Sequence, residues 1–205
     1  MRTLSLFLAL PLLTSAQSLS VGILGGAPFQ DVVKNATTTG ITSVAKSTNF
    51  TVGPAIQVNL PANFRVEVDV LFRPYTFGLA LPLVISPAPG VPASARSVDV
   101  SAKQWRFPLL AQYRLGKSRV QPFIEGGLSF DHLSGLTSAV KSTITSGPGQ
   151  LLHQDNASII MGAGLDVKIP LLRVSGEFRF SRPTVSNFSS ISNLNQAEVL
   201  VGVHF

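Results

Sequence analysis

The clearest strand signal in this 205-residue chain is the segment Phe64-Arg-Val-Glu-Val-Asp-Val-Leu-Phe72. Apolar side chains occupy every second position, and Arg65, Glu67 and Asp69 occupy positions between them. Successive side chains of a β-strand point to opposite faces, so the segment predicts a strand with one apolar face and one charged face. A helix would instead repeat its apolar residues every three or four positions.

The same alternation recurs along the chain and predicts about eight strands. Each is about 10 residues long, the length that a tilted membrane-spanning strand needs. The other segments are 19–29, 50–60, 104–115, 120–131, 157–169, 172–180 and 196–205. We therefore expect an all-β chain that forms an eight-stranded antiparallel up-and-down transmembrane β-barrel.

The predicted connections alternate in length. Tight turns are expected at 61–63, at 116–119 and near Pro170, and the long connections are 30–49, 79–103, 132–156 and 183–195. In outer-membrane barrels the short turns face the periplasm and the long loops face outward. The pattern therefore predicts that both chain ends lie on the periplasmic side.

The N-terminal segment has the composition of an export signal. Arg2 gives a positive start, and an apolar run follows from Leu4 to Leu13. Small residues at 14–16 suit cleavage before Gln17. The apolar run is shorter than the roughly 20 residues that a membrane-spanning helix needs. We expect residues 1–16 to be a signal peptide and residues 17–205 to form one barrel domain.

Composition excludes several classes of protein. The absence of cysteine excludes a disulfide scaffold, a thiolate metal site and cysteine catalysis. Only 13% of the residues are charged while 45% are hydrophobic, whereas soluble domains carry about 25% charged residues. This imbalance favours a surface that is partly covered by lipid.

The charged face of the strands is expected to line the lumen. A soluble barrel that holds a ligand also has alternating strands, but its apolar face would have to fit inside a narrow eight-stranded lumen. Seven basic and seven acidic residues fall on the polar face, which suits ion pairing in a closed interior. The predicted lumen charge network is Arg65, Glu67, Asp69, Arg73, Arg106, Arg114, Glu125, Asp131, Asp166, Lys168, Arg173, Glu177, Arg179 and Glu198.

Aromatic residues of the apolar face fall near both ends of the strands. Rings at the two boundaries of a lipid bilayer form girdles in such barrels. The predicted girdle residues are Phe64, Trp105, Tyr113, Phe130, Phe180 and Phe205.

The segment Gln121-Pro-Phe-Ile-Glu-Gly-Gly-Leu-Ser-Phe130 and the last strand carry a family resemblance. With the strand pattern, they make the chain resemble the small outer-membrane barrels of the OmpA transmembrane domain and OmpX type. In that family a terminal aromatic residue with alternating apolar residues is the signal that the barrel assembly machinery reads. The matching positions are Val199, Val201, Val203 and Phe205. The resemblance implies an outer-membrane location, and since the sequence stops at Phe205 no periplasmic domain is expected.

Residues with catalytic or metal-binding potential are few. Asp131, His132 and Ser134 lie together, but residues this close on one strand do not easily converge into a relay. The three histidines are scattered, so we expect no metal, no cofactor and no enzymatic activity.

The formal net charge of +6 arises mostly near the predicted long loops. Such a cationic rim is expected to bind the phosphates of outer-leaflet lipid, such as lipopolysaccharide, through residues that include Lys103 and Arg182. Nucleic-acid binding is not expected, because carboxylates match the strand arginines. We expect a monomer with a structural or surface-interaction role; a narrow pore for small solutes and a lipid-modifying enzyme are the alternatives.

Overall fold

The computed structural model describes residues 19–29, 36–38, 41–46, 50–81, 96–134, 153–185 and 194–205. Every regular element of these residues is a β-strand, and the strands form one sheet in which all pairings are antiparallel. No helix in this part of the chain is long and apolar enough to cross a membrane. The predicted signal peptide at residues 1–16 lies outside the described residues.

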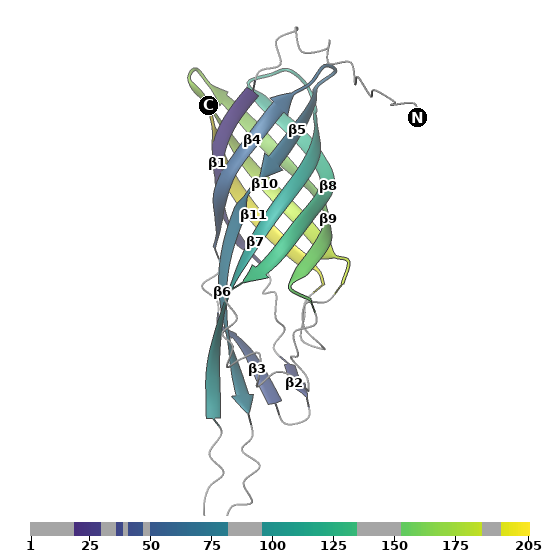
Figure 1. The fold of residues 1–205 in the computed structure, drawn as a ribbon. Coiled ribbons are helices and arrows are strands. Elements are labelled where there is room, and N and C mark those ends of the chain that lie inside the picture. The colour runs from purple at the N-terminus through teal and green to yellow at the C-terminus, as the bar shows by residue number, and fades with distance from the viewer. Residues whose placement is uncertain are drawn as a thin grey trace, which may run out of the picture.

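Eight strand positions close into a barrel (Figure 1). Strand β1 pairs with β4 on one side and with β11 on the other, so the ring has no free edge. The predicted eight-stranded antiparallel barrel is confirmed. Its strands are β1 (Leu19–Pro28), β4 (Thr51–Asn59), β5 (Phe64–Asp69) with β6 (Leu71–Leu81), β7 (Arg96–Arg114), β8 (Val120–Ser134), β9 (Asp155–Ile169), β10 (Leu172–Pro183) and β11 (Gln196–His204).

Strands β5 and β6 occupy one position of the ring and are divided only at Val70. The register continues unchanged across this residue on both neighbouring strands, where it places Val70 opposite Pro54 and Asp69 opposite Pro108. The Val70 amide donates to the Pro54 carbonyl at 3.0 Å, but a proline has no amide hydrogen to return. The two prolines therefore interrupt the ladder without ending the strand.

The two ends of the barrel differ in their connections. We call the end with the short turns at 60–63, 115–119 and 170–171 the turn end, and the opposite end the loop end. Figure 1 draws the turn end, with the C-terminus, at the top. Ala62, Asn63 and Gly116 adopt positive φ angles, which allow the chain to reverse tightly. The three short turns lie where the sequence predicts them.

The described strands extend farther at the loop end than the sequence predicts. The predicted loops 30–49 and 79–103 contain β2 (Ala36–Thr38), β3 (Ile41–Lys46), the end of β6 and the first residues of β7. Strands β3, β6 and β7 pair beyond the ring, where they are visible below the barrel in Figure 1. The predicted long connections therefore begin later and contain more strand residues than the sequence indicates.

Residues on the outward face are apolar and exposed, while residues on the inward face are buried. Ile124 and Leu128 of β8 are each 53% exposed, whereas Phe123, at an inward position of the same strand, is 1% exposed. The interior is narrow: a Cβ atom on Gly164 would lie 2.6 Å from the Gly176 carbonyl and would also meet the Phe123 ring. Glycine at position 164 therefore makes room for Phe123 in the lumen.

Candidate functional site

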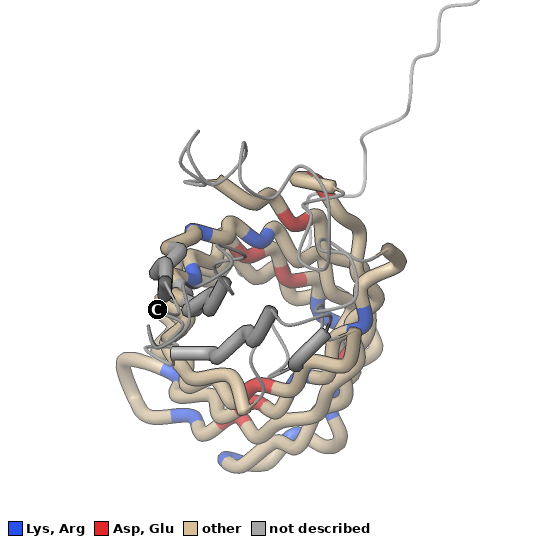
Figure 2. The backbone as a smooth tube through the Cα atoms, turned by 90° about the horizontal axis from the view of Figure 1, so that it is seen from below, with Lys and Arg blue, Asp and Glu red and all other residues tan. Residues whose placement is uncertain are grey.

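The lumen holds most of the charged residues that the sequence assigns to it. Basic and acidic residues are distributed around the whole ring of strands (Figure 2). Eleven of the fourteen predicted network residues are at most 7% exposed; these are Arg65, Glu67, Asp69, Arg73, Arg106, Glu125, Asp131, Asp166, Glu177, Arg179 and Glu198.

Three of the predicted network residues are not buried. Arg114 and Arg173 are half-buried near the turn end, and Lys168 is exposed. Lys168 lies one residue before the last residue of β9, so its inward position falls outside the closed part of the lumen. The placement of Lys168 in the lumen network was therefore wrong.

The central layer of the lumen is one guanidinium held by four carboxylates. Arg179 Nε donates to Glu125 Oε1 at 3.0 Å, and Nη1 donates to Asp69 Oδ2 at 2.7 Å. Its Nη2 donates to Glu177 Oε2 at 2.7 Å and also to Glu67 Oε1. Charge-assisted hydrogen bonds of this kind are among the strongest in proteins. Three strands, β5, β8 and β10, are therefore joined through one side chain.

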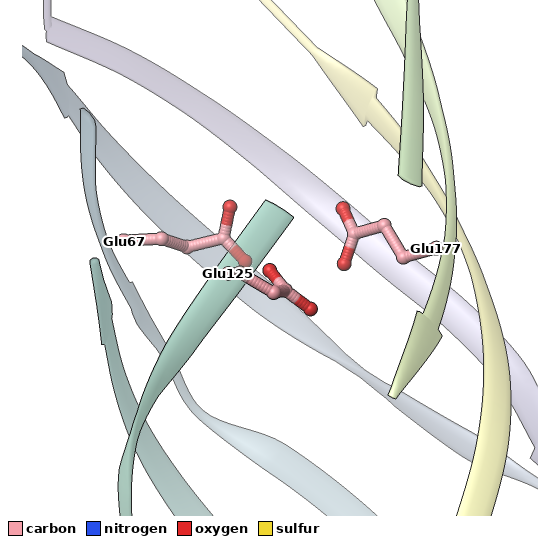
Figure 3. Close-up of side chains that lie close together, drawn as sticks. All are labelled: Glu67, Glu125 and Glu177. Atoms are coloured by element: carbon pink, nitrogen blue, oxygen red, sulfur yellow. The ribbon is translucent and has the colours of Figure 1, made fainter. Parts of the chain in front are cut away.

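Three glutamates of this layer also have the spacing of a metal site. Oxygens of Glu67, Glu125 and Glu177 lie within 4.8 Å of one another, and Figure 3 shows the three carboxylates converging. However, all six of these oxygens already accept hydrogen bonds. The donors are Arg179, Gln57, Gln112 and Ser175. The three glutamates therefore bind the Arg179 guanidinium, and a metal cation would have to displace that group.

The layer toward the loop end is centred on Glu198. Arg106 Nη1 donates to Glu198 Oε1 at 2.8 Å, and Arg73 Nη2 pairs with Glu198 Oε2. Arg106 Nε also lies 3.4 Å from Asp131 Oδ1. Two buried arginines thus face two buried carboxylates, and the formal charges of this layer balance.

The layer toward the turn end contains more basic than acidic groups. Arg65 Nη2 lies 2.8 Å from Asp166 Oδ2, and Arg173 Nε lies 3.6 Å from Asp166 Oδ1. The Arg65 guanidinium also stacks over Phe123, 5.3 Å from the ring centroid, in a cation–π contact. One carboxylate therefore serves two arginines in this layer.

Two glutamines join the central layer to the layer at the turn end. Gln112 Oε1 accepts from Arg65 Nε, while its Nε2 donates to Glu67 at 3.0 Å and to Glu125 at 2.8 Å. Gln57 likewise accepts from Arg65 Nη1 at 3.1 Å and donates to Glu67. An amide can do this because it carries both a donor and an acceptor. The sequence prediction missed both residues, although each lies at an inward position of the alternation.

The buried charges do not balance as the sequence predicts. Four buried arginines face seven buried carboxylates, and the half-buried Arg114 and Arg173 reduce but do not remove the acidic excess. The excess is concentrated around Arg179, where four carboxylates share one guanidinium. The centre of the lumen is thus acidic and the turn end is basic.

Aromatic residues of the outward face form pairs between strands near both ends of the barrel. Phe64 packs against Tyr113 with ring centroids 5.0 Å apart, and Phe72 packs against Trp105 at 5.1 Å. Eight residues of a tilted strand separate Trp105 from Tyr113, which corresponds to about 21 Å along the barrel axis. This spacing is close to the apolar band of about 25 Å in outer-membrane barrels.

The other predicted girdle residues also lie on the outward face. Phe130 is 64% exposed, Phe205 is 73% exposed, and Phe180 is half-buried. Phe72 was not predicted as a girdle residue, although its pairing with Trp105 places it at the same boundary.

His132, near the loop end, forms a pair with Asp155 that the sequence did not reveal. His132 points outward and its Nδ1 lies 2.6 Å from Asp155 Oδ1 of the neighbouring strand. Asp131 instead points inward to the lumen, and the Ser134 hydroxyl donates to the Lys103 carbonyl at 3.3 Å. The structure therefore does not bring Asp131, His132 and Ser134 together as a relay.

The last strand closes the barrel. Val199 and Val201 are exposed on its outward face, and Val203 is half-buried. Phe205 exchanges two backbone hydrogen bonds with Val21 of β1, at 2.8 and 3.2 Å. These are the positions that resemble the assembly signal.

Comparison with known proteins points to one family. The family model described as outer membrane protein beta-barrel domain matches residues 15–189. Neisserial surface protein A (NspA) superposes with a TM-score of 0.55 at 13% sequence identity, over 91% of this chain and 94% of that one. The N-terminal β-barrel domain of Pseudomonas aeruginosa OprF gives 0.44 at 14% identity, over 92% and 98%. No curated protein matches the sequence.

Proposed function

Because the chain belongs to the outer membrane protein β-barrel domain family, we propose that it is a closed outer-membrane barrel with a structural or surface-interaction role. In this orientation the turn end is periplasmic and the loop end faces outward, as in other outer-membrane barrels. The lumen acts as a packed core that ties the strands together, and the loop end supplies the surface for contact.

The observation that carries this proposal is the central layer around Arg179. Its guanidinium and the carboxylates of Glu67 and Asp69 are 0% exposed. Buried Phe123 and Leu110 add apolar volume to the same interior. An ion or solute that crossed the lumen would have to break several buried charge-assisted bonds, and each such break is costly.

Conductance measurements test the closed lumen. The full chain, expressed with its export signal and purified from the outer membrane, is inserted into planar bilayers. We expect no steady conductance from the native barrel, and open events with Arg179→Ala, which removes the central cation. A large stable conductance of the native protein would contradict the proposal and favour the narrow pore. In that case the excess of lumen carboxylates predicts selectivity for cations.

The loop end offers a second, more specific role in lipid contact. Lys103 and Arg182 point outward and are exposed; Lys103 lies two residues before Trp105 on β7, and Arg182 two residues after Phe180 on β10. Phosphates of lipopolysaccharide lie at this boundary, and a cation near a bilayer surface attracts them. Replacing Lys103 and Arg182 with Gln should weaken lipopolysaccharide binding about tenfold; unchanged affinity in a binding titration rejects this role.

The last strand, β11, has a proposed role in assembly of the barrel, which the amount of folded protein in the outer membrane tests. We propose that Val199, Val201, Val203 and Phe205 are recognised by the barrel assembly machinery. Phe205→Ala should lower the amount of folded protein in the outer membrane, while Val21→Ala, which changes the partner residue on β1, should have little effect. Equal outer-membrane levels of native and Phe205→Ala protein would contradict the assignment.

The barrel is proposed to work as a monomer without a cofactor, without nucleic acid and without catalytic activity. The spatial separation of Asp131 from His132 supports the last point.

A further inference from the structure

The periplasmic end of the barrel carries a concentration of basic residues that the closed-lumen function does not use. Among the described residues at this end there is one acidic side chain, Asp166, which is buried. We define the periplasmic collar as the basic residues that surround the rim of this end. They are Arg114, Lys117, Arg119, Lys168 and Arg173.

Most of the collar has no carboxylate partner in the described part of the chain. Arg119 Nε donates to the Lys168 carbonyl at 3.1 Å, and Arg114 Nε lies 3.4 Å from the Asn63 carbonyl. Asp166 is shared by Arg173 and the buried Arg65. Backbone carbonyls carry no net charge, so Asp166 is the one side-chain carboxylate that offsets the positive charge of the described collar.

Two collar residues of different hairpins are held side by side. The Lys168 amide donates to the Arg119 carbonyl at 2.9 Å, and the Arg119 side chain returns a hydrogen bond to the Lys168 carbonyl. Both side chains are exposed. Neighbouring exposed cations repel each other, so an anion that lies between Arg119 and Lys168 would stabilise this arrangement.

Exposed apolar residues lie next to these cations. Leu171, in the turn between β9 and β10, is 89% exposed, and Leu19 and Phe205 are 63% and 73% exposed. Leu171 therefore stands between two collar residues, Lys168 and Arg173, in the sequence. Apolar side chains beside cations match the boundary between acyl chains and phosphates in a bilayer.

An open pocket of about 300 Å³ joins the two kinds of side chain. Lys168, Arg173 and His204 provide its polar part, and Leu19, Leu171 and Phe205 are among its apolar lining. This lining suits a ligand with an anionic group at one end and hydrocarbon at the other.

We propose that the periplasmic collar binds the phosphate headgroup of an anionic phospholipid in the periplasmic leaflet, with Leu171 against its acyl chains. This rests on the proposed orientation of the barrel in the outer membrane. The phosphate lies between Lys168 and Arg119, which donate charge-assisted hydrogen bonds, while Arg173 is held by Asp166 and adds positive charge to the same end. Binding of this lipid would fix the depth and tilt of the turn end, independently of the contacts at the loop end.

The experiment compares lipids that differ in headgroup charge only. The purified full-length barrel, in zwitterionic detergent, is titrated with spin-labelled phosphatidylglycerol or phosphatidylcholine of the same chain length. We expect about a fivefold or greater preference for phosphatidylglycerol. Lys117→Gln/Arg119→Gln/Lys168→Gln should reduce the preference to about one. The matched control Lys103→Gln/Arg182→Gln, which removes cations at the loop end, should keep it.

Two further arms decide the source of the phosphate. Soluble glycerophosphate at the concentration of the lipid should not compete, and Leu171→Ser should weaken lipid binding. Equal competition by glycerophosphate would overturn the lipid proposal in favour of a free phosphate ligand. The collar proposal would also be overturned if the triple variant kept the preference for phosphatidylglycerol, or if the loop-end control lost it.

Heat-modifiable migration of every sample on gels separates this proposal from the proposed function. A folded barrel that resists SDS until boiled but shows no lipid preference rejects the collar alone. Absence of the heat shift in the native protein rejects the folded barrel on which both proposals depend.

Discussion

Arg179 of β10 and Asp69 of β5 are 110 residues apart in the chain, yet Arg179 Nη1 donates to Asp69 Oδ2 across the lumen at 2.7 Å. The two strands are not neighbours in the ring, because β9, β8 and β7 separate them on one side and β11, β1 and β4 on the other. The contact is therefore a direct link between opposite walls of the barrel. Both side chains are fully buried, so its loss cannot be offset by water.

Replacing the central cation should destabilise the barrel severely. Arg179→Met keeps much of the side-chain volume but leaves four carboxylates without their shared guanidinium. Removing one partner of a buried ion pair costs about 3–5 kcal/mol of the free energy of unfolding. Urea unfolding of the barrel in lipid bilayers, followed by heat-modifiable migration, measures this loss.

Charge removal provides the matching rescue. The triple variant Arg179→Met/Glu125→Gln/Glu177→Gln should regain part of the stability, because two fewer charges remain buried without a partner. Arg182→Met on the outward face should change the free energy of unfolding by less than about 0.5 kcal/mol. Equal effects of Arg179→Met and Arg182→Met would contradict the role of the central layer.

The alternation of residues predicts the ring of strands because lipid constrains one face at every second position. Strand segments beyond the lipid band have no such constraint. The first residues of β7, from Arg96, and the short strands β2 and β3 were therefore predicted as loops, although backbone pairing extends to them. At Val70 the sequence instead predicts one continuous strand, because the alternation runs through this residue. The structure divides the strand there only because the prolines on the neighbouring strands interrupt the backbone hydrogen bonds.

The sequence also predicts most of the buried charges, since inward positions follow from the same alternation. It does not predict their partners, which depend on the stagger between strands. Arg179 contacts Glu67, 112 residues away, because of that stagger. Gln57 and Gln112 lay on the polar face in the sequence, but nothing there distinguished them from other polar residues. Lys168 lies at an inward position of the alternation, but β9 has already passed the rim of the barrel there, so its side chain is exposed and does not enter the lumen.

A methyl group on Gly164 should destabilise the barrel. The added Cβ atom would meet both the Phe123 ring and the Gly176 carbonyl, and overpacking of this kind costs about 1–3 kcal/mol. Gly164→Ala should therefore lower the urea midpoint, and Phe123→Leu in the same chain should restore part of it. Gly176→Ala is the control, because a Cβ there has no atom within 4 Å. A larger loss from Gly176→Ala than from Gly164→Ala would refute this account.

Loss of the Gln112 amide should uncouple the central layer from the layer at the turn end. Gln112→Leu removes one acceptor from Arg65 and two donated hydrogen bonds, so we expect a loss of about 2–3 kcal/mol in the free energy of unfolding. Gln104→Leu is a matched control: Gln104 is also buried, but its Oε1 has no hydrogen-bond partner among the described residues. Gln104→Leu should therefore leave the free energy of unfolding nearly unchanged. Similar losses in both variants would mean that burial, rather than bridging, gives Gln112 its importance.

Trp105 provides a direct measurement of the depth of the barrel in the bilayer. It is the single tryptophan of the chain, is 39% exposed and packs against Phe72 on the outward face. If the aromatic pairs form the two girdles, its indole ring lies near the headgroups. Doxyl groups close to the headgroup should then quench its fluorescence more strongly than doxyl groups at the end of the acyl chain. Tyr113→Phe should leave this order unchanged, because that residue belongs to the opposite girdle. Strongest quenching by the deepest label would place Trp105 in the bilayer centre and contradict the girdle assignment.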